Sequence, residues 1–267
     1  PVSVSAFFAG MLSKVGVYAL IRMFTLVFTT NTGITHTTLL IVAALTMLFG
    51  VIGAASQMEM RRILSFHIIS QVGYMVMGLG LFTPLALAGS IFYIMHHIIV
   101  KTNLFLVSGV ARRLQGSYQL SQLGGLYQKA PALTAIFMIS AFSLAGIPPL
   151  SGFWAKLILV KASLDVSGYI IAATALGVGL LTLFSMAKIW AAAFWGDTPE
   201  TTDAGAEKPW KTFSYSEKTA LYLPMILLGA LTLTIGLMSQ PFFELATRAA
   251  EQLLSPAGYI QAVLGGR

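Results

Sequence analysis

The sequence contains no cysteine among its 267 residues, and it is poor in charge. The first absence excludes disulfide bonds, thiolate metal sites and cysteine nucleophiles from this chain. Charged residues make up 9% of the sequence, whereas soluble domains carry about 25%. Apolar residues make up 57%, and the mean hydropathy is +0.82. This composition indicates an integral membrane protein. The net charge of +7 then fits basic cytoplasmic loops better than a nucleic-acid partner.

The start of the sequence lacks two further features. There is no initiator methionine, and no basic segment precedes a short apolar core, so no signal peptide is visible. We therefore expect a fragment of a longer protein, with its N-terminal half absent.

Long apolar runs fill most of the chain. Each is long enough to cross about 30 Å of hydrocarbon, and none shows the short alternating pattern of a transmembrane barrel. Backbone polar groups in lipid must be satisfied within the segment, which predicts helices. The sequence thus predicts an all-α integral membrane protein with about seven transmembrane helices, at residues 5–29, 36–55, 63–83, 85–110, 131–164, 168–194 and 218–239.

The fifth run is interrupted by Pro148 and Pro149. Two successive prolines remove two backbone N–H donors and clash with the preceding turn. We therefore expect one discontinuous helix at membrane depth, where protein or water satisfies the freed carbonyl groups.

Basic residues gather in alternate loops. The first and third loops carry no Lys or Arg, whereas the second, fourth and sixth loops do, at Arg61, Arg62, Arg112, Arg113, Lys129, Lys208, Lys211 and Lys218. Because cytoplasmic loops collect basic residues, we expect the even loops to be cytoplasmic and the C-terminus to lie outside. We divide the chain into a transmembrane bundle over 1–240 and an amphipathic tail over 241–267, which we expect on the membrane surface.

Three lysines lie deep within the apolar runs. Lys14 is near the middle of the first run, Lys101 lies in the fourth, and Lys156 follows the proline break. A charge at bilayer depth costs roughly 2.5–3.5 kcal/mol on insertion scales. No Asp or Glu lies deep in any predicted span, so these lysines lack a carboxylate partner in this sequence. They indicate a path for ions or protons, and hydrogen bonds to backbone carbonyls are the structural alternative.

Two histidines accompany the second lysine. His97 stands four residues before Lys101 and shares its helix face, and His96 is adjacent to it. Imidazole titrates near neutrality, and a lysine removed from water can release its proton. These side chains are therefore a candidate proton relay. For His96 alone, a histidine held in the core is an equal alternative.

A second polar group lies in the third run. His67 and Gln71 share a helix face, with Ser70 beside them. They are candidates for relaying protons or holding water, and polar contacts between helices are the alternative. The sequence shows no catalytic triad, carboxylate pair or metal cluster. We therefore predict no catalytic site of its own, no metal and no cofactor.

Four segments resemble, in the same order, the C-terminal half of the antiporter-like subunits. That family includes the A-type and D-type subunits of Mrp Na⁺/H⁺ antiporters and the proton-pumping membrane subunits of respiratory complex I. The segments are PVSVSAFFAGMLSKVGVYALIR, RRILSFHIISQVGYM, HHIIVKTNLFLVSG and LAGIPPLSGFWAKLIL. The first and last look most like the D-type branch of the Mrp (Mnh/Pha) antiporters.

The resemblance implies fourteen helices in two inverted repeats, of which this chain would hold the eighth to the fourteenth. It implies a proton relay through Lys14, His97, Lys101 and Lys156. The expected function is proton translocation in a multisubunit Na⁺/proton antiporter of a bacterial cell membrane, with lipid and other subunits as partners. Two alternatives stay open. One is a subunit of a redox-driven pump, like complex I or a membrane-bound hydrogenase, and the other is a non-conducting structural subunit.

Overall fold

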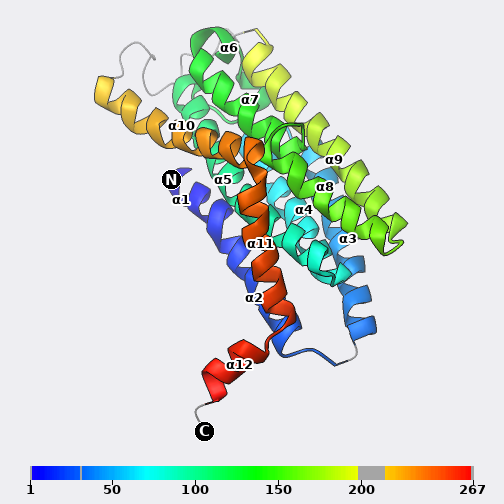
Figure 1. Cartoon of the computed structure of the whole chain (residues 1–267). Coiled ribbons are helices and arrows are strands. Elements are labelled where there is room, and N and C mark those ends of the chain that lie inside the picture. Colours follow the sequence, from blue (N-terminus) through cyan, green and yellow to red (C-terminus); the bar gives the residue numbers. More distant parts are fainter. Residues whose placement is uncertain (1, 31, 198–213, 266–267) are drawn as a thin grey trace.

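A computed structural model describes residues 2–30, 32–197 and 214–265 of the chain (Figure 1). Within these residues the regular structure is helical, and β pairing is confined to one isolated bridge between Glu59 and Gln119. The prediction of an all-α membrane protein is confirmed. Six helical segments are long and apolar enough to cross a membrane, namely Val4–Leu26, Thr32–Ser56, Met60–Leu81, Pro84–Gln115, Tyr169–Trp195 and Tyr215–Leu237.

The predicted fifth span is a pair of short helices. α7 (Pro131–Ala145) ends where Gly146 adopts a left-handed conformation, and α8 (Ser151–Asp165) begins after the two prolines. Gly146 fits this position because a φ of +93° carries no steric cost without a Cβ atom. The break predicted at Pro148 and Pro149 is therefore present. Together α7 and α8 account for the one predicted crossing that no single long helix provides.

The first span is also irregular. A π-helical turn, Phe8–Leu12, joins α1 (Val2–Phe7) to α2 (Ser13–Leu26). Such wide turns leave backbone carbonyls free of the regular i to i−4 pattern, and they are frequent at functional sites. Nothing in the sequence indicated this turn, because no proline or glycine pair marks it.

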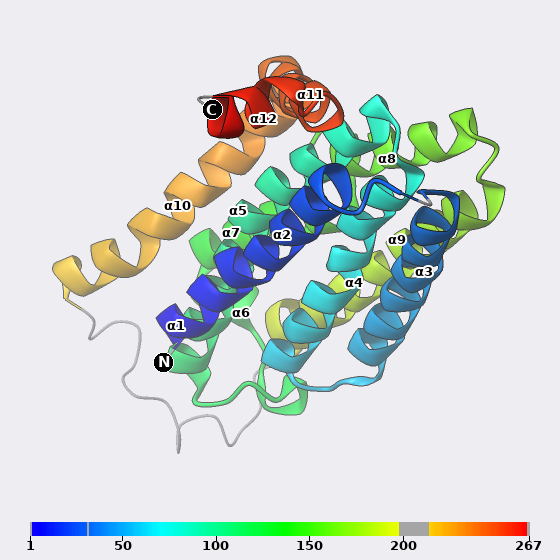
Figure 2. The same cartoon turned by 90° about the horizontal axis from the view of Figure 1, so that it is seen from below.

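Two helices form the centre of the bundle. α4 (Met60–Leu81) and α5 (Pro84–Gln115) have the largest buried share among the six spans. α3 (Thr32–Ser56) and α9 (Tyr169–Ile189) pack beside each other, and α10 (Tyr215–Leu237) lies at the opposite side of the bundle from α3 (Figure 2). Side chains that project from α4 and α5 toward each other are thus removed from lipid and water.

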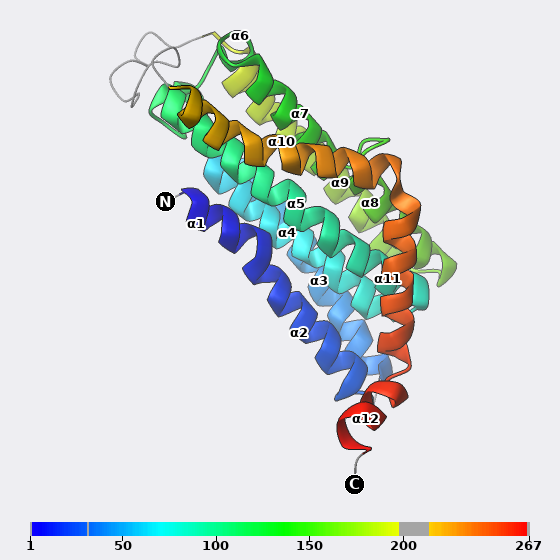
Figure 3. The ribbon, with the colours of Figure 1, turned by 60° about the vertical axis from the view of Figure 1, so that its left-hand side comes forward.

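The C-terminal segment follows α10 at an angle. α11 (Ser239–Leu254) turns away from the direction of α10 and packs along α5, and α12 (Ala257–Leu264) follows it (Figure 3). Ala246 and Ala250 of α11 are fully buried, whereas Arg248 and Glu251 are exposed. The placement of the tail on the membrane surface stays a prediction.

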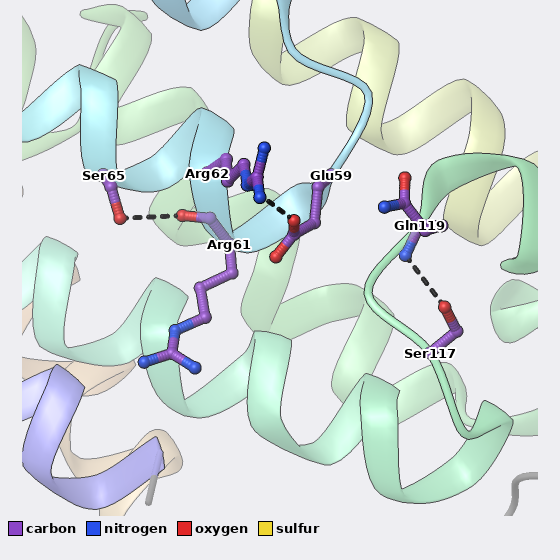
Figure 4. A network of polar contacts seen from close by, with 6 residues as sticks. All are labelled: Glu59, Arg61, Arg62, Ser65, Ser117 and Gln119. Carbon is purple, nitrogen blue, oxygen red and sulfur yellow. Dashed lines mark hydrogen bonds and ion pairs between the residues drawn. The ribbon is translucent and has the colours of Figure 1, made fainter.

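The second and fourth loops meet at one end of the bundle. The Met60 amide donates to the Tyr118 carbonyl and the Leu120 amide donates to the Met58 carbonyl, both at 2.9 Å. Beside this pairing, the guanidinium of Arg62 lies 2.9 Å from the Glu59 carboxylate (Figure 4). Predicted loop residues Lys208 and Lys211 lie outside the described residues.

The same end holds two arginines around one aromatic ring. The guanidinium carbons of Arg61 and Arg112 lie 5.8 and 5.2 Å from the centre of the Tyr118 ring. Each distance is within the range of a cation–π contact. The basic residues of the second and fourth loops therefore share one face of the molecule.

Candidate functional site

Lys101 is completely buried between α4 and α5. Its Nζ donates to the carbonyl oxygen of Leu64 at 3.0 Å. His67 lies one turn further along α4, is also completely buried, and has no hydrogen-bond partner for either ring nitrogen among the described residues. Buried polar atoms in proteins nearly always have a partner, from protein or from ordered water. The unpaired ring nitrogens therefore mark a place where water or a mobile proton belongs.

His97 and His96 continue the polar row along α5 toward the helix break. Both ring nitrogens of His97 are buried and lack a hydrogen-bond partner within the described part of the chain. The Nδ1 of His96 is 2.8 Å from the hydroxyl of Ser151, the first residue of α8, and that hydroxyl is 3.0 Å from the Ser143 hydroxyl of α7. The row thus leads from Lys101 to the junction of the two half-helices.

Lys156 closes the end of α7. Its Nζ donates to the carbonyl oxygens of Leu144 and Ala145 at 3.0 and 2.9 Å, and these are the last two residues of that helix. A cation is favoured there because the end of a helix carries unsatisfied carbonyls and a partial negative charge. The same ammonium lies 5.3 Å from the ring centre of Tyr74.

Lys14 uses the π-helical turn in a similar way. Its Nζ donates to the Ala9 carbonyl at 2.5 Å, inside the turn, and the side chain is almost fully buried. The three predicted lysines therefore each bind backbone carbonyls, as the structural alternative required. Within the described residues no Asp or Glu is buried, so none of these ammonium groups has a carboxylate beside it in the core.

The buried charges and imidazoles are close enough to interact electrostatically. His97 interacts with Lys14 and Lys101, and His96 interacts with Lys156 and Lys14. The structure thus brings the four predicted relay residues and His96 into one group, in which Lys156 is partly buried and the other four are buried. Because like charges repel strongly in a medium of low dielectric constant, the protonation of one member disfavours protonation of its neighbours.

A pair of tyrosines borders this group. Tyr93 and Tyr74 stack with ring centres 5.2 Å apart, and the rings of Tyr93 and His96 meet edge to face at 5.7 Å. The Tyr93 hydroxyl donates to the Oε1 of Gln71, whereas the Nε2 of Gln71 has no described partner. Gln71 therefore borders the group through Tyr93, and its role in relaying protons or holding water stays a prediction.

Ser70 lies apart from the group. Its hydroxyl donates to the Met47 carbonyl of α3 at 3.0 Å, so it acts as a contact between two helices. The sequence had offered both roles for this residue, and the geometry matches the second.

Sequence reasoning missed several polar partners. Ser151 and Ser143 join His96 to the helix break, and Tyr93 orients Gln71. Asn103, on α5, donates to the Ser140 hydroxyl at 2.9 Å and keeps a buried Oδ1 without a described partner. Tyr93 lies three residues before His96 on α5, and Asn103 lies seven residues after it. Only this helical spacing could have indicated the two residues from the sequence.

Comparisons with known proteins identify the family of this chain. The family described as NADH:quinone oxidoreductase/Mrp antiporter, TM matches residues 1–185. The D-type Na⁺/H⁺ antiporter subunit of Alkalihalophilus pseudofirmus is 52% identical over 99% of this chain, and that of Bacillus subtilis is 38% identical over 99%. The match covers 52% of each relative, so this chain spans about half the length of these relatives.

Solved structures give the same picture. A chain in the Mrp complex from Dietzia sp. superposes with a TM-score of 0.87 at 37% identity, over 98% of this chain and 55% of that one. A chain in respiratory complex I from Thermus thermophilus superposes with a TM-score of 0.74 at 23% identity, over 91% of this chain and 50% of that one. The second likeness shows the shared fold alone.

A broken helix and a buried row of lysines and histidines within one helical bundle define the class of protein. The class is that of integral membrane proteins with the antiporter-like fold. The chain belongs to the NADH:quinone oxidoreductase/Mrp antiporter transmembrane family. The resemblance drawn from the four sequence segments is confirmed.

Proposed function

We propose that this chain is the proton-translocating C-terminal half of the D-type subunit of a multisubunit Na⁺/proton antiporter. The proton moves through Lys101, His97, His96 and Lys156, and Lys14 acts on His97 from α2. The sequence had suggested the order Lys14, His97, Lys101 and Lys156. The contact of His96 with the start of α8 supports its addition between His97 and Lys156.

The unpaired imidazoles carry this proposal. The carbonyl contacts of the lysines fit a purely structural subunit as well, since such contacts alone stabilise a helix end. The completely buried ring nitrogens of His67 and His97 have no hydrogen-bond partner among the described residues, so the carbonyl contacts of the lysines leave them unexplained. An imidazole that relays protons accepts a proton at one ring nitrogen and releases a proton from the other, so both nitrogens take part in exchange with water or a neighbouring amine.

A redox-driven pump is the nearest alternative within the family. The relatives at 52% and 38% identity are named antiporter subunits, whereas the complex I chain is 23% identical. This difference favours the antiporter. The buried group contains amines and imidazoles without carboxylates, so we place the Na⁺ site on another subunit or at an interface.

The proposed orientation places the even loops in the cytoplasm of a bacterial cell and the C-terminus outside. The gathering of Arg61 and Arg112 around Tyr118 supports this orientation, because both basic loops occupy one face.

The proposed partners are other antiporter subunits and membrane lipid. We keep the proposed division of the chain into a transmembrane bundle over 1–240 and a surface tail over 241–267.

The test is antiport in everted membrane vesicles that contain the full-length subunit in its complex. We expect Lys156→Ala to abolish exchange driven by the pH gradient, because the amine leaves the row. Lys161→Ala is the matched control, since Lys161 is an exposed lysine on the same helix. Exchange at the unaltered rate in Lys156→Ala would overturn the proposed role of Lys156.

A further inference from the structure

Arg22 stands in an environment unlike that of the buried lysines. Its guanidinium carbon lies 4.4 Å from the ring centre of Tyr259 in α12, and no described carboxylate lies within ion-pair distance of it. No hydrogen-bond acceptor among the described residues contacts this guanidinium. Arginine keeps its charge in proteins and offers five N–H donors in a plane, which match a phosphate group. A contact through the ring face leaves those in-plane donors available.

This arginine borders an open cavity of about 350 Å³ that lies between α2, α5, α11 and α12. Apolar side chains dominate its lining, including Ile21, Ile91, Ile94, Met95 and Leu253. The cavity therefore joins a fixed cation to an apolar surface that suits a hydrocarbon chain.

The two parts of the cavity lie at different depths. Arg22 is four residues before the end of α2 at Leu26, which places it about 6 Å from that end. Ile91 and Met95 are seven and eleven residues beyond the start of α5 at Pro84, or about 10 to 16 Å inside. These two helix ends belong to the first and third loops, which we place on the same side. Figure 1 shows α12 beside this end of α2.

We propose that the cavity binds an anionic phospholipid, with its phosphate on Arg22 and an acyl chain over the α5 side chains. A cation at headgroup depth and an apolar floor below it match the two chemical parts of such a lipid. A helix of the other half of this subunit, or of a partner subunit, is the competing occupant, but it would have to bring its own anion to Arg22. This inference rests on the membrane-spanning fold and is independent of the proposed proton relay.

The first test measures lipid binding to the purified, delipidated complex by native mass spectrometry, with phosphatidylglycerol as the probe and phosphatidylcholine for comparison. We expect Arg22→Gln to weaken phosphatidylglycerol binding about fivefold, since one basic residue at an anionic surface is worth about that factor. Arg22→Lys should keep most of the binding. Arg248→Gln is the control, because Arg248 is exposed on α11 and does not line the cavity. Equal binding in Arg22→Gln and the unaltered complex would overturn the proposal.

The second test identifies the occupant without altering the charge. A photoreactive benzoylphenylalanine replaces Ile94, which is half-buried in the cavity, in the full complex in native membranes. We expect crosslinks to phospholipid, detected as a mass increase of this subunit. Crosslinks to protein alone, whether within this subunit or to another one, would refute the lipid site. This result decides the question even if Arg22→Gln fails to assemble.

Discussion

The ammonium of Lys156 lies 2.9 Å from the carbonyl oxygen of Ala145, so a side chain of one half-helix closes the end of the other. Both halves come from one apolar run that the two prolines divide. The contact satisfies carbonyls that the break leaves free. In the proposed relay, the Lys156 amine must release either these carbonyls or its proton when a proton passes. The structural role and the proposed transport role of this amine can be separated by changing only its ability to lose a proton.

Lys156→Arg is expected to separate the two roles. The guanidinium keeps the positive charge and donates to carbonyls, but it does not lose its proton in proteins. We expect the complex to assemble with a melting temperature near that of the unaltered protein, and antiport in everted vesicles to fall at least tenfold. Lys161→Arg on the same helix should leave both measurements unchanged. If Lys156→Arg transports at the original rate, the amine acts only as a fixed charge.

Gly152 allows the two half-helices to meet. A Cβ atom built on this residue would overlap the backbone carbonyl of Ser143, which cannot move without shifting α7. Overpacking of this kind typically costs about 1–3 kcal/mol. We therefore expect Gly152→Ala to lower the melting temperature of the complex by several degrees and to reduce antiport. Gly177→Ala is the control, because a Cβ atom there would meet nothing within 4 Å. Equal stability of the two variants would contradict the tight junction.

The features that depend on composition and local backbone chemistry could be predicted from the sequence. Apolar length predicted the spans, and the two prolines predicted the break between α7 and α8, because both effects act locally. The face shared by His97 and Lys101 followed from helical spacing. The π-helical turn that receives the Lys14 ammonium could not be predicted, since no local residue pattern demands it.

Contacts between helices that are far apart in the sequence were the second feature that the sequence did not predict. The bond of His96 to Ser151 joins residues 55 positions apart, and that of Lys188 to Ala55 joins residues 133 positions apart. Such pairs depend on how the helices pack, which spacing along one helix does not reveal. The structure shows that Lys188, near the end of α9, binds the end of a neighbouring helix.

Lys188 is expected to stabilise the end of α3. Its Nζ donates to the carbonyl oxygens of Ala55 and Gln57 at 2.7 and 2.6 Å, where that helix terminates. Removal of hydrogen bonds from a charged donor typically costs about 1–3 kcal/mol. We expect Lys188→Met to lower the melting temperature of the solubilised complex by several degrees, and Lys188→Arg to restore most of the loss. A melting temperature unchanged in Lys188→Met would show that these contacts add no stability.

The orientation can be tested with single cysteines, since this chain contributes none. In a cysteine-free full-length subunit, Ser121→Cys marks the fourth loop, Val166→Cys the end of α8 and Ser255→Cys the tail, and all three positions are exposed. We expect a membrane-impermeant maleimide to label Val166→Cys and Ser255→Cys on intact cells, and Ser121→Cys only in everted vesicles. This pattern follows from basic loops retained in the cytoplasm. Labelling of Ser121→Cys on intact cells would reverse the orientation, and a shared side for Ser121→Cys and Val166→Cys would show that α7 and α8 do not complete a crossing.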